Sequence, residues 1–320
     1  MTRSLVLVLS MAGVLGIVML INWQGARNVG AHLATGGWQL LWLAPWYLLC
    51  MVFDSASWSA LLAPARHTRW LCLYTTWVGA AVNWLLPVAQ VGGDLLRIRL
   101  VHQRDVPFAD AVASTIVDKT LQAVTVLVFA FAGTLALVAY VGQVPYGAGV
   151  LGSSAAVGLG VLVFYLLQRR GLFAGALRRA RIARRFRSAE LQQGAEQIDE
   201  AVRTRYADGR ALRRALGHRV LFRLLMVGEV YLAMRFLGQP ISLFDSFIIQ
   251  SLSQAVRSAA FLVPGGMGVQ EGGIVLLTMS LGIDADIGVS LALAKRAREL
   301  LVGLPALLWL QWRGALRWWR

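Results

Sequence analysis

Charged residues, cysteine and histidine are scarce in this sequence. Charged residues occupy 15% of its 320 positions, whereas soluble domains average about 25%, so the composition argues against a soluble enzyme. The two cysteines, Cys50 and Cys72, lie inside apolar runs, which argues against a disulfide framework and a Cys-x-x-Cys metal site. The four histidines lack metal-ligand spacing, and the sequence contains no Walker motif, paired-aspartate metal motif or nucleophile elbow. We therefore expect no metal, no cofactor and no enzymatic activity.

Apolar residues and arginine are abundant instead. Apolar residues make up 58% of the chain, the mean hydropathy is +0.62, and the net charge is +15, from 29 arginines and only 2 lysines. A basic chain often binds nucleic acid. The apolar excess favours a membrane protein whose basic segments face the anionic cytoplasmic leaflet. Membrane lipids, and not nucleic acid, are therefore the expected partners.

Several apolar runs approach the roughly 20 residues that a helix needs to cross a bilayer. They lie at residues 5–21, 38–62, 71–91, 111–141, 147–167, 220–237, 243–263, 269–282 and 287–312. These runs predict an all-α polytopic integral membrane protein with a single membrane domain over residues 1–320. We expect about 6–8 transmembrane helices and two re-entrant broken helices.

The hydrophilic stretch at residues 168–219 sets the expected orientation. It contains 14 arginines and five acidic residues, so we expect a cytoplasmic segment on the membrane surface. A nucleic-acid site is disfavoured there because stacking aromatics are nearly absent. Both termini are then cytoplasmic. The basic loops at 66–69 and 97–104 are also expected inside, which requires the run at 71–91 to enter and leave on one face.

Two stretches of the chain match each other at an offset of 177 residues, 86–94 with 263–271. The charged residues that coincide are Asp94 with Glu271 and Lys119 with Arg296. The residues expected to break the helices are Pro87, Gly92 and Gly93 in the first unit, and Pro264, Gly265, Gly266 and Gly268 in the second. The repeated halves, 71–141 and 243–312, would face opposite sides, as in transporters with inverted repeats. The alternative is a chance resemblance between two apolar segments rich in Gly and Pro.

Ionisable side chains inside the expected spans are the candidate functional residues, because each costs roughly 2.5–3.5 kcal/mol on insertion. The cations expected to hold a lipid headgroup are Arg97, Lys119, Arg257, Lys295, Arg296 and Arg298. The acids expected to act as gates or proton carriers are Asp94, Asp118, Glu271 and Glu299. Alternatively, such ion pairs only fix helix packing, and Arg97 snorkels toward the inner face. Asp54 and Asp245 lie near expected span ends and are assigned no role.

The last apolar run concentrates these charges. Helical spacing places Lys295, Arg298 and Glu299 on one face, and Arg296 adds a third cation. This excess of positive charge needs an anionic partner. The candidates are Asp94, Asp118 and Glu271 within the chain, or a lipid phosphate, which arginine binds through a bidentate fork.

Two motifs resemble a known family. Leu-Val-Pro-Gly-Gly-Met-Gly-Val-Gln-Glu-Gly-Gly at 262–273 and Leu-Leu-Pro-Val-Ala-Gln-Val-Gly-Gly-Asp-Leu-Leu-Arg at 85–97 resemble the lysylphosphatidylglycerol synthase transmembrane (flippase-like) family. The run at 295–305 resembles its hopanoid-biosynthesis-associated branch. One departure is the Asp-Lys pair at 118–119, where many relatives carry Glu-Arg. The aminoacyl-transfer chemistry of the synthase is not carried over.

The resemblance implies a multi-pass protein of the bacterial inner membrane that moves an amphiphilic lipid between leaflets. A hopanoid-related lipid and a polyprenyl phosphate are the candidate substrates. Two other functions stay open. One is an integral-membrane transferase that modifies a lipid, for which acid–base pairs would serve. The other is a scaffold that organises lipid-biosynthesis enzymes through residues 168–219.

Overall fold

The computed structural model describes residues 26–62, 68–86, 91–141, 166, 189–259 and 268–312. All regular secondary structure within these ranges is helical, which confirms the all-α prediction for this part of the chain. The elements are α2 (Ala26–Gly36), η1 (Gly37–Trp42), α3 (Leu43–Leu61), α4 (Thr68–Leu85), α5 (Gly92–His102), α6 (Phe108–Val141), α9 (Ala189–Ala207), α10 (Gly209–Phe236), α11 (Leu243–Ala259), α12 (Val269–Ser280) and α13 (Ala285–Trp312).

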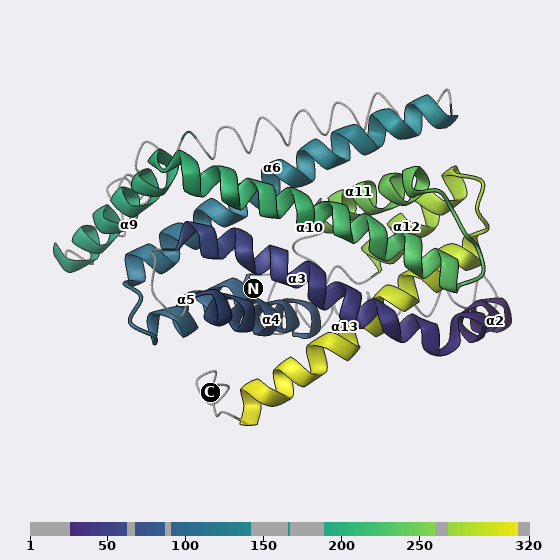
Figure 1. Ribbon diagram of the computed structural model, residues 1–320, viewed down its shortest axis with the longest axis horizontal. Helices are drawn as coiled ribbons and strands as arrows, with labels where there is room; N and C mark the ends of the chain where they lie inside the picture. The colour runs from purple at the N-terminus through teal and green to yellow at the C-terminus, as the bar shows by residue number, and fades with distance from the viewer. Residues whose placement is uncertain are drawn as a thin grey trace.

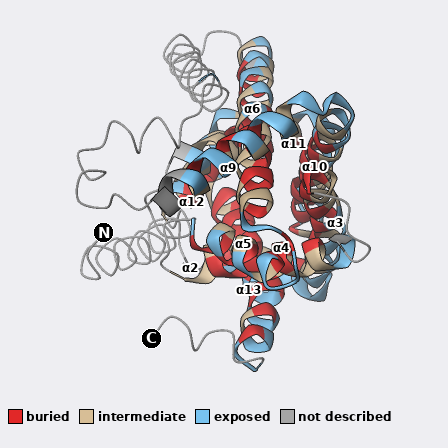
Figure 2. Ribbon diagram, turned by 90° about the vertical axis from the view of Figure 1, so that its left-hand side faces the viewer, coloured by how far each residue is buried: buried red, intermediate tan, exposed pale blue. Residues whose placement is uncertain are grey.

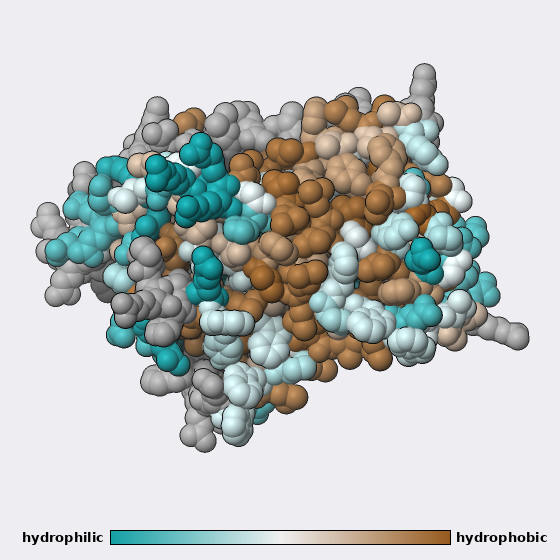
Figure 3. Space-filling model, viewed as in Figure 1, coloured by the Kyte–Doolittle hydropathy of each residue, from teal (hydrophilic) through white to brown (hydrophobic). Residues whose placement is uncertain are grey.

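The surface of the bundle is apolar over wide areas. Within the described residues, Asn28–Leu61 and Phe108–Tyr140 are helical stretches long and apolar enough to cross a membrane. Figure 3 shows apolar side chains gathered across the middle of one face and hydrophilic ones toward its two ends. Among the exposed apolar side chains, Val128 is 59% and Leu308 is 65% exposed. An apolar belt of this width would be unfavourable in water and suits hydrocarbon.

The helices pack against one another in two pairs and one set of three. Helix α3 lies along α10, α4 and α5 pack together, and α12 packs on both α11 and α13 (Figure 1). The groups are joined by contacts of α4 with α13 and of α6 with α11. Buried residues line the inward faces of these helices (Figure 2). The largest buried side chain is that of Trp58, which packs with Leu62 and Cys72.

The residues expected to break the helices fall, in sequence, between separate helices or at the start of one. Helices α4 and α5 are separate elements, as are α11 and α12. Of the residues expected to cause the breaks, Pro87, Pro264, Gly265 and Gly266 lie outside the described residues, whereas Gly92, Gly93 and Gly268 are described.

Glycine is required at two of these positions. A Cβ on Gly93 would lie 2.0 Å from the carbonyl oxygen of Gly79 on α4, so only glycine allows α5 to approach so closely. Its N–H donates to Asn83 Oδ1 at 2.8 Å. Gly268 has φ of +80°, a conformation that L side chains rarely adopt. These two glycines therefore hold the first turns of α5 and α12 in place.

Helix α10 begins earlier than the apolar run at 220–237 indicates. Its N-cap is Asp208, whose carboxylate accepts from the backbone N–H groups of Arg210 and Ala211. The helix therefore includes the end of the basic stretch at 168–219, and it buries Arg219 at 1% exposure. Hydropathy is assigned residue by residue, so it scores arginine as a solvated residue. It contains no information about carboxylates that other helices bring close to the arginine.

Candidate functional site

A polar cavity lies between the helices. Its volume is about 160 Å³, enough for several water molecules. Side chains from α3, α4, α5, α6, α10, α11, α12 and α13 line it. The cations in its wall are Arg97, Lys119, Arg223, Arg257, Lys295 and Arg298, and the carboxylates are Asp54, Asp94 and Glu299. Cations therefore outnumber carboxylates in the wall.

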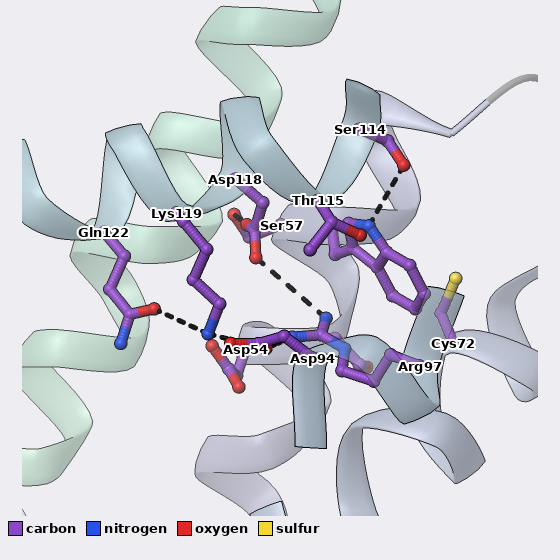
Figure 4. A network of polar contacts seen from close by, with 12 residues as sticks. Asp54, Ser57, Cys72, Asp94, Arg97, Ser114, Thr115, Asp118, Lys119 and Gln122 are labelled. Atoms are coloured by element: carbon purple, nitrogen blue, oxygen red, sulfur yellow. Dashed lines mark hydrogen bonds and ion pairs between the residues drawn. The ribbon is translucent and has the colours of Figure 1, made fainter. Parts of the chain in front are cut away.

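A first cluster of ion pairs joins α3, α5, α6 and α10. Lys119 Nζ lies 2.9 Å from Asp94 Oδ1, and Arg97 Nη1 lies 3.6 Å from the same oxygen (Figure 4). Arg219 bonds both Asp118 and Asp54, so one guanidinium joins α10 to α6 and α3. The cluster thus combines three carboxylates with three cations.

Neutral side chains complete this cluster. Ser57 Oγ donates to Asp118 Oδ1 at 3.1 Å, and Lys119 Nζ donates to Gln122 Oε1 at 3.2 Å. The guanidinium of Arg97 lies 4.1 Å from the centre of the Trp58 ring, within reach of a cation–π interaction. Arg97 is 5% exposed, so it is buried within the bundle.

A second cluster joins α10, α11, α12 and α13. Glu299 accepts from Arg257 Nη1 and from Arg296 Nη1, both at 2.6 Å. Arg296 also bonds Glu271. Arg298 Nε donates to Glu229 Oε1 at 2.7 Å. Three carboxylates again meet three cations, as in the first cluster.

Glu271 links the helix break to the second cluster. Its Oε2 accepts from the backbone N–H of Gly268 at 2.7 Å, while its Oε1 bonds Arg296 on α13. One carboxylate therefore fixes the first turn of α12 against α13. A carboxylate at a helix N-terminus is also stabilised by the helix dipole.

Of the ten charged residues that the sequence nominated, nine belong to the two clusters and seven line the cavity. Glu271, one of the three carboxylates considered as partners of the last run, bonds Arg296, while Asp94 and Asp118 bond cations of the first cluster. Lys295 is 5% exposed and donates from Nζ to the amide oxygen of Gln250 at 2.7 Å. Within the described residues, no group of His, Cys, Asp or Glu could hold a metal ion.

Sequence reasoning missed part of the site. Asp54 received no role, and Arg219 and Arg223 were not among the candidates, yet Asp54 and Arg223 line the cavity. Glu229 was not among the candidates either, although it pairs with Arg298. A signal exists for the two arginines: they stand four residues apart and so share one face of a helix that continues into an apolar run.

The geometry places a positively charged cavity inside a bundle with an apolar surface, and the comparison with protein families agrees with such an arrangement. A model of the family described as "Lysylphosphatidylglycerol synthase TM region" matches residues 6–306. A search of curated proteins and a search of solved structures found no match. Since the family match covers nearly the whole chain, the protein belongs to the lysylphosphatidylglycerol synthase TM region family and is a multi-pass integral membrane protein with a lipid-related role.

Proposed function

We propose that this protein is a lipid translocase, which moves an anionic or amphiphilic lipid between the leaflets of the bacterial inner membrane. The observation that carries this proposal is the polar cavity, whose wall holds six cations and three carboxylates within a membrane region. Buried charges are costly in hydrocarbon and mark substrate paths in membrane proteins. A lipid headgroup needs such a polar path, while its acyl chains remain in the bilayer.

The spacing of the helices along the chain supports the proposal. Helices α5 and α12 begin at Gly92 and Val269, and α6 and α13 begin at Phe108 and Ala285, so both pairs are 177 residues apart. This is the offset at which the two sequence stretches align. We infer that α4–α5–α6 and α11–α12–α13 are equivalent units.

The ion pairs have the same spacing. Lys119 bonds Asp94 and Gln122, and Arg296 bonds Glu271 and Glu299, which are the residues at the corresponding positions. Matching contacts between separate helices favour a repeat over a chance resemblance between segments rich in Gly and Pro. The packing supports the same equivalence, because α4 contacts α13 and α6 contacts α11.

The arrangement favours an inverted repeat. Helices α6 and α13 lie on opposite sides of the bundle and run in opposite directions, and α5 and α12 lie toward opposite ends (Figure 1). We propose that α4–α5 is re-entrant from the cytoplasm and α11–α12 from outside, with both termini cytoplasmic. In transporters of this build, the substrate site lies at the interface of the repeats. The cations would then hold the headgroup, and the carboxylates would release and recapture them as the path opens.

Reconstituted liposomes test the proposed function. A fluorescent anionic lipid is placed in both leaflets, and a membrane-impermeant reagent quenches the outer one. We expect the protein to accelerate transfer, and Arg296→Ala or Glu271→Gln to slow it by at least about tenfold, since each breaks a charge-assisted bond. The matched control is Arg214→Ala, an exposed residue on α10, which should leave the rate unchanged.

Other outcomes would contradict the translocase. Chemical change of the lipid that requires a soluble donor would indicate a transferase. Full complementation in cells by both variants, together with loss of function on deleting residues 168–219, would indicate a scaffold. Arg296→Lys, which keeps the charge, distinguishes loss of folding from loss of transport.

A further inference from the structure

Two buried cations remain after the charges of the two clusters are matched. Each cluster combines three carboxylates with three cations, whereas Arg223 and Lys295 form no ion pair within the described residues. Both line the cavity, and they are 4% and 5% exposed. Within the described residues, the cavity wall therefore carries positive charge that no carboxylate pairs with, and a bound anion would lower the cost of burying it in a bilayer.

Arg223 presents its free donors in a specific geometry. Its Nε and Nη2 are buried and have no hydrogen-bond partner in the described part of the chain. These two nitrogens form one edge of the guanidinium, with parallel N–H bonds spaced to bind two oxygens of one phosphate. The centre of the Phe222 ring lies 5.7 Å from the guanidinium carbon of Arg223, and this contact uses neither of the two donors.

The carboxylates near Arg223 are already engaged. Asp54, which lines the same cavity, is bonded to Arg219, and Asp94 is bonded to Lys119. Glu299 is bonded to two arginines. Within the described residues, the carboxylates of the cavity wall therefore leave the Nε–Nη2 edge of Arg223 without an ion-pair partner.

We propose that the Nε–Nη2 edge of Arg223 binds the phosphate group of a lipid headgroup in the cavity, with Lys295 supplying a second positive charge. This inference rests on the proposed function, because it takes the cavity as the path of the headgroup. Two uncompensated cations match a phosphate monoester, which carries about −1.5 to −2 charges at pH 7. A phosphate diester or a carboxylate carries less charge, so phosphatidic acid binds more tightly than phosphatidylglycerol.

Lipid binding to the purified full chain in a nonionic detergent tests this site. Short-chain phosphatidic acid is titrated by calorimetry, with phosphatidylglycerol and phosphatidylcholine of the same chain length for comparison. Arg223→Gln removes the charge, and Arg223→Lys keeps the charge but loses the fork. We expect both to weaken the binding of phosphatidic acid by about 10–100-fold, while Arg214→Gln on the same helix leaves it unchanged. Lys295→Met should also weaken binding, by a smaller factor.

Inorganic phosphate, titrated at constant ionic strength, identifies the source of the phosphate group. Displacement of phosphatidic acid by millimolar inorganic phosphate, lost in Arg223→Gln, assigns the site to free phosphate. Failure to displace it assigns the site to the lipid.

Thermal unfolding separates binding from folding. Without lipid, Arg223→Gln should melt at or above the temperature of the wild type, because it removes an unpartnered buried charge. Phosphatidic acid should raise the melting temperature of the wild type but not of this variant. A Gln variant that binds within twofold of the wild type would overturn the proposal. So would a Lys variant with full affinity.

The two proposals fail separately. If the protein binds phosphatidic acid through Arg223 but transfers no lipid in liposomes, the phosphate site stands and the translocase is refuted. If Arg223→Gln transfers lipid normally and binds phosphatidic acid with unchanged affinity, only the phosphate site is refuted.

Discussion

Buried arginines act differently from one another according to the partners around each side chain. Arg219 bonds two carboxylates on different helices, Arg298 bonds one and stacks 3.9 Å from the centre of the Tyr47 ring, and Arg223 has a free edge. A paired arginine stabilises the bundle, because its carboxylates would otherwise be buried and uncompensated. Arg223 differs because it combines free donors with the lack of an ion-pair partner within the described residues, and we propose an anionic ligand as that partner.

Arg219 should be essential for stability. Arg219→Met leaves Asp54 and Asp118 without their shared cation, which we expect to lower the free energy of unfolding by about 3–5 kcal/mol. Arg219→Lys should recover part of this loss, since one ammonium does not reproduce a fork that bonds two carboxylates. Denaturant unfolding in detergent measures both, with Arg214→Met as the exposed control. An unchanged midpoint for Arg219→Met would show that the two carboxylates do not depend on this cation.

At the scale of elements, short helices begin where glycine permits close contact. Gly93 lets α5 lie against the carbonyl of Gly79, and Gly268 adopts the left-handed conformation that precedes α12. The first turns of both helices then carry a carboxylate, Asp94 or Glu271, that reaches a cation on the next long helix. The first turns of these two helices therefore position the charges.

Gly93→Ala tests the close approach of α4 and α5. The added Cβ would lie 2.0 Å from Gly79 O, so the helices must separate, and we expect a loss of about 1–3 kcal/mol in the free energy of unfolding. Gly194→Ala on α9 is the matched control, because nothing lies within 4 Å of its Cβ position; it should be neutral or stabilising by up to about 1 kcal/mol. Equal stability of the two variants would contradict the proposed close contact.

The N-cap of α10 should make stability depend on pH. The N–H of Ala211, with that of Arg210, bonds the Asp208 carboxylate and holds the pKa of Asp208 below its ordinary value of 3.8. The stabilisation is therefore complete above pH 3.8 and is lost as the pH falls through the lower pKa of the folded state. Thermal melts of the wild type and Asp208→Ala should differ at pH 7 and converge in acid. A difference that persists unchanged at low pH would argue against this cap.

At the scale of the whole molecule, the position of each charge relative to the bilayer follows from how the two proposed repeat units, α4–α5–α6 and α11–α12–α13, are oriented. The turn between α5 and α6 and the turn between α12 and α13 occupy corresponding positions of these units. If the units are inverted, these two turns lie on opposite sides of the membrane. The cavity then lies between two breaks that open toward opposite faces.

Thiol labelling of whole cells tests this inversion. Arg104→Cys and Asp284→Cys each place a thiol at an exposed turn, whereas the native Cys50 and Cys72 are buried and should react slowly. A membrane-impermeant maleimide added outside should label the cysteine at 284 and not the one at 104. Inverted vesicles should give the opposite result. Labelling of both sites from one side would refute the inverted arrangement.

The predicted fold and site depended on different kinds of signal. Apolar runs located most of the described helices, because burial in hydrocarbon acts on each run locally. They did not locate the start of α10 at Gly209, because its first turns are basic. They also did not identify Asp54, which appeared to lie near the end of a span and instead pairs with Arg219.

The sequence by itself determined a helical membrane protein with an unusual number of arginines inside apolar segments, since composition and hydrophobic length suffice for that conclusion. Only the tertiary structure decided which of those charges are neutralised, because ion pairs join residues on helices far apart in the chain. Arg219 and Arg223 stand on the same face of α10, yet one meets two carboxylates and the other meets none in the described bundle. That difference depends on packing, and no local pattern encodes it.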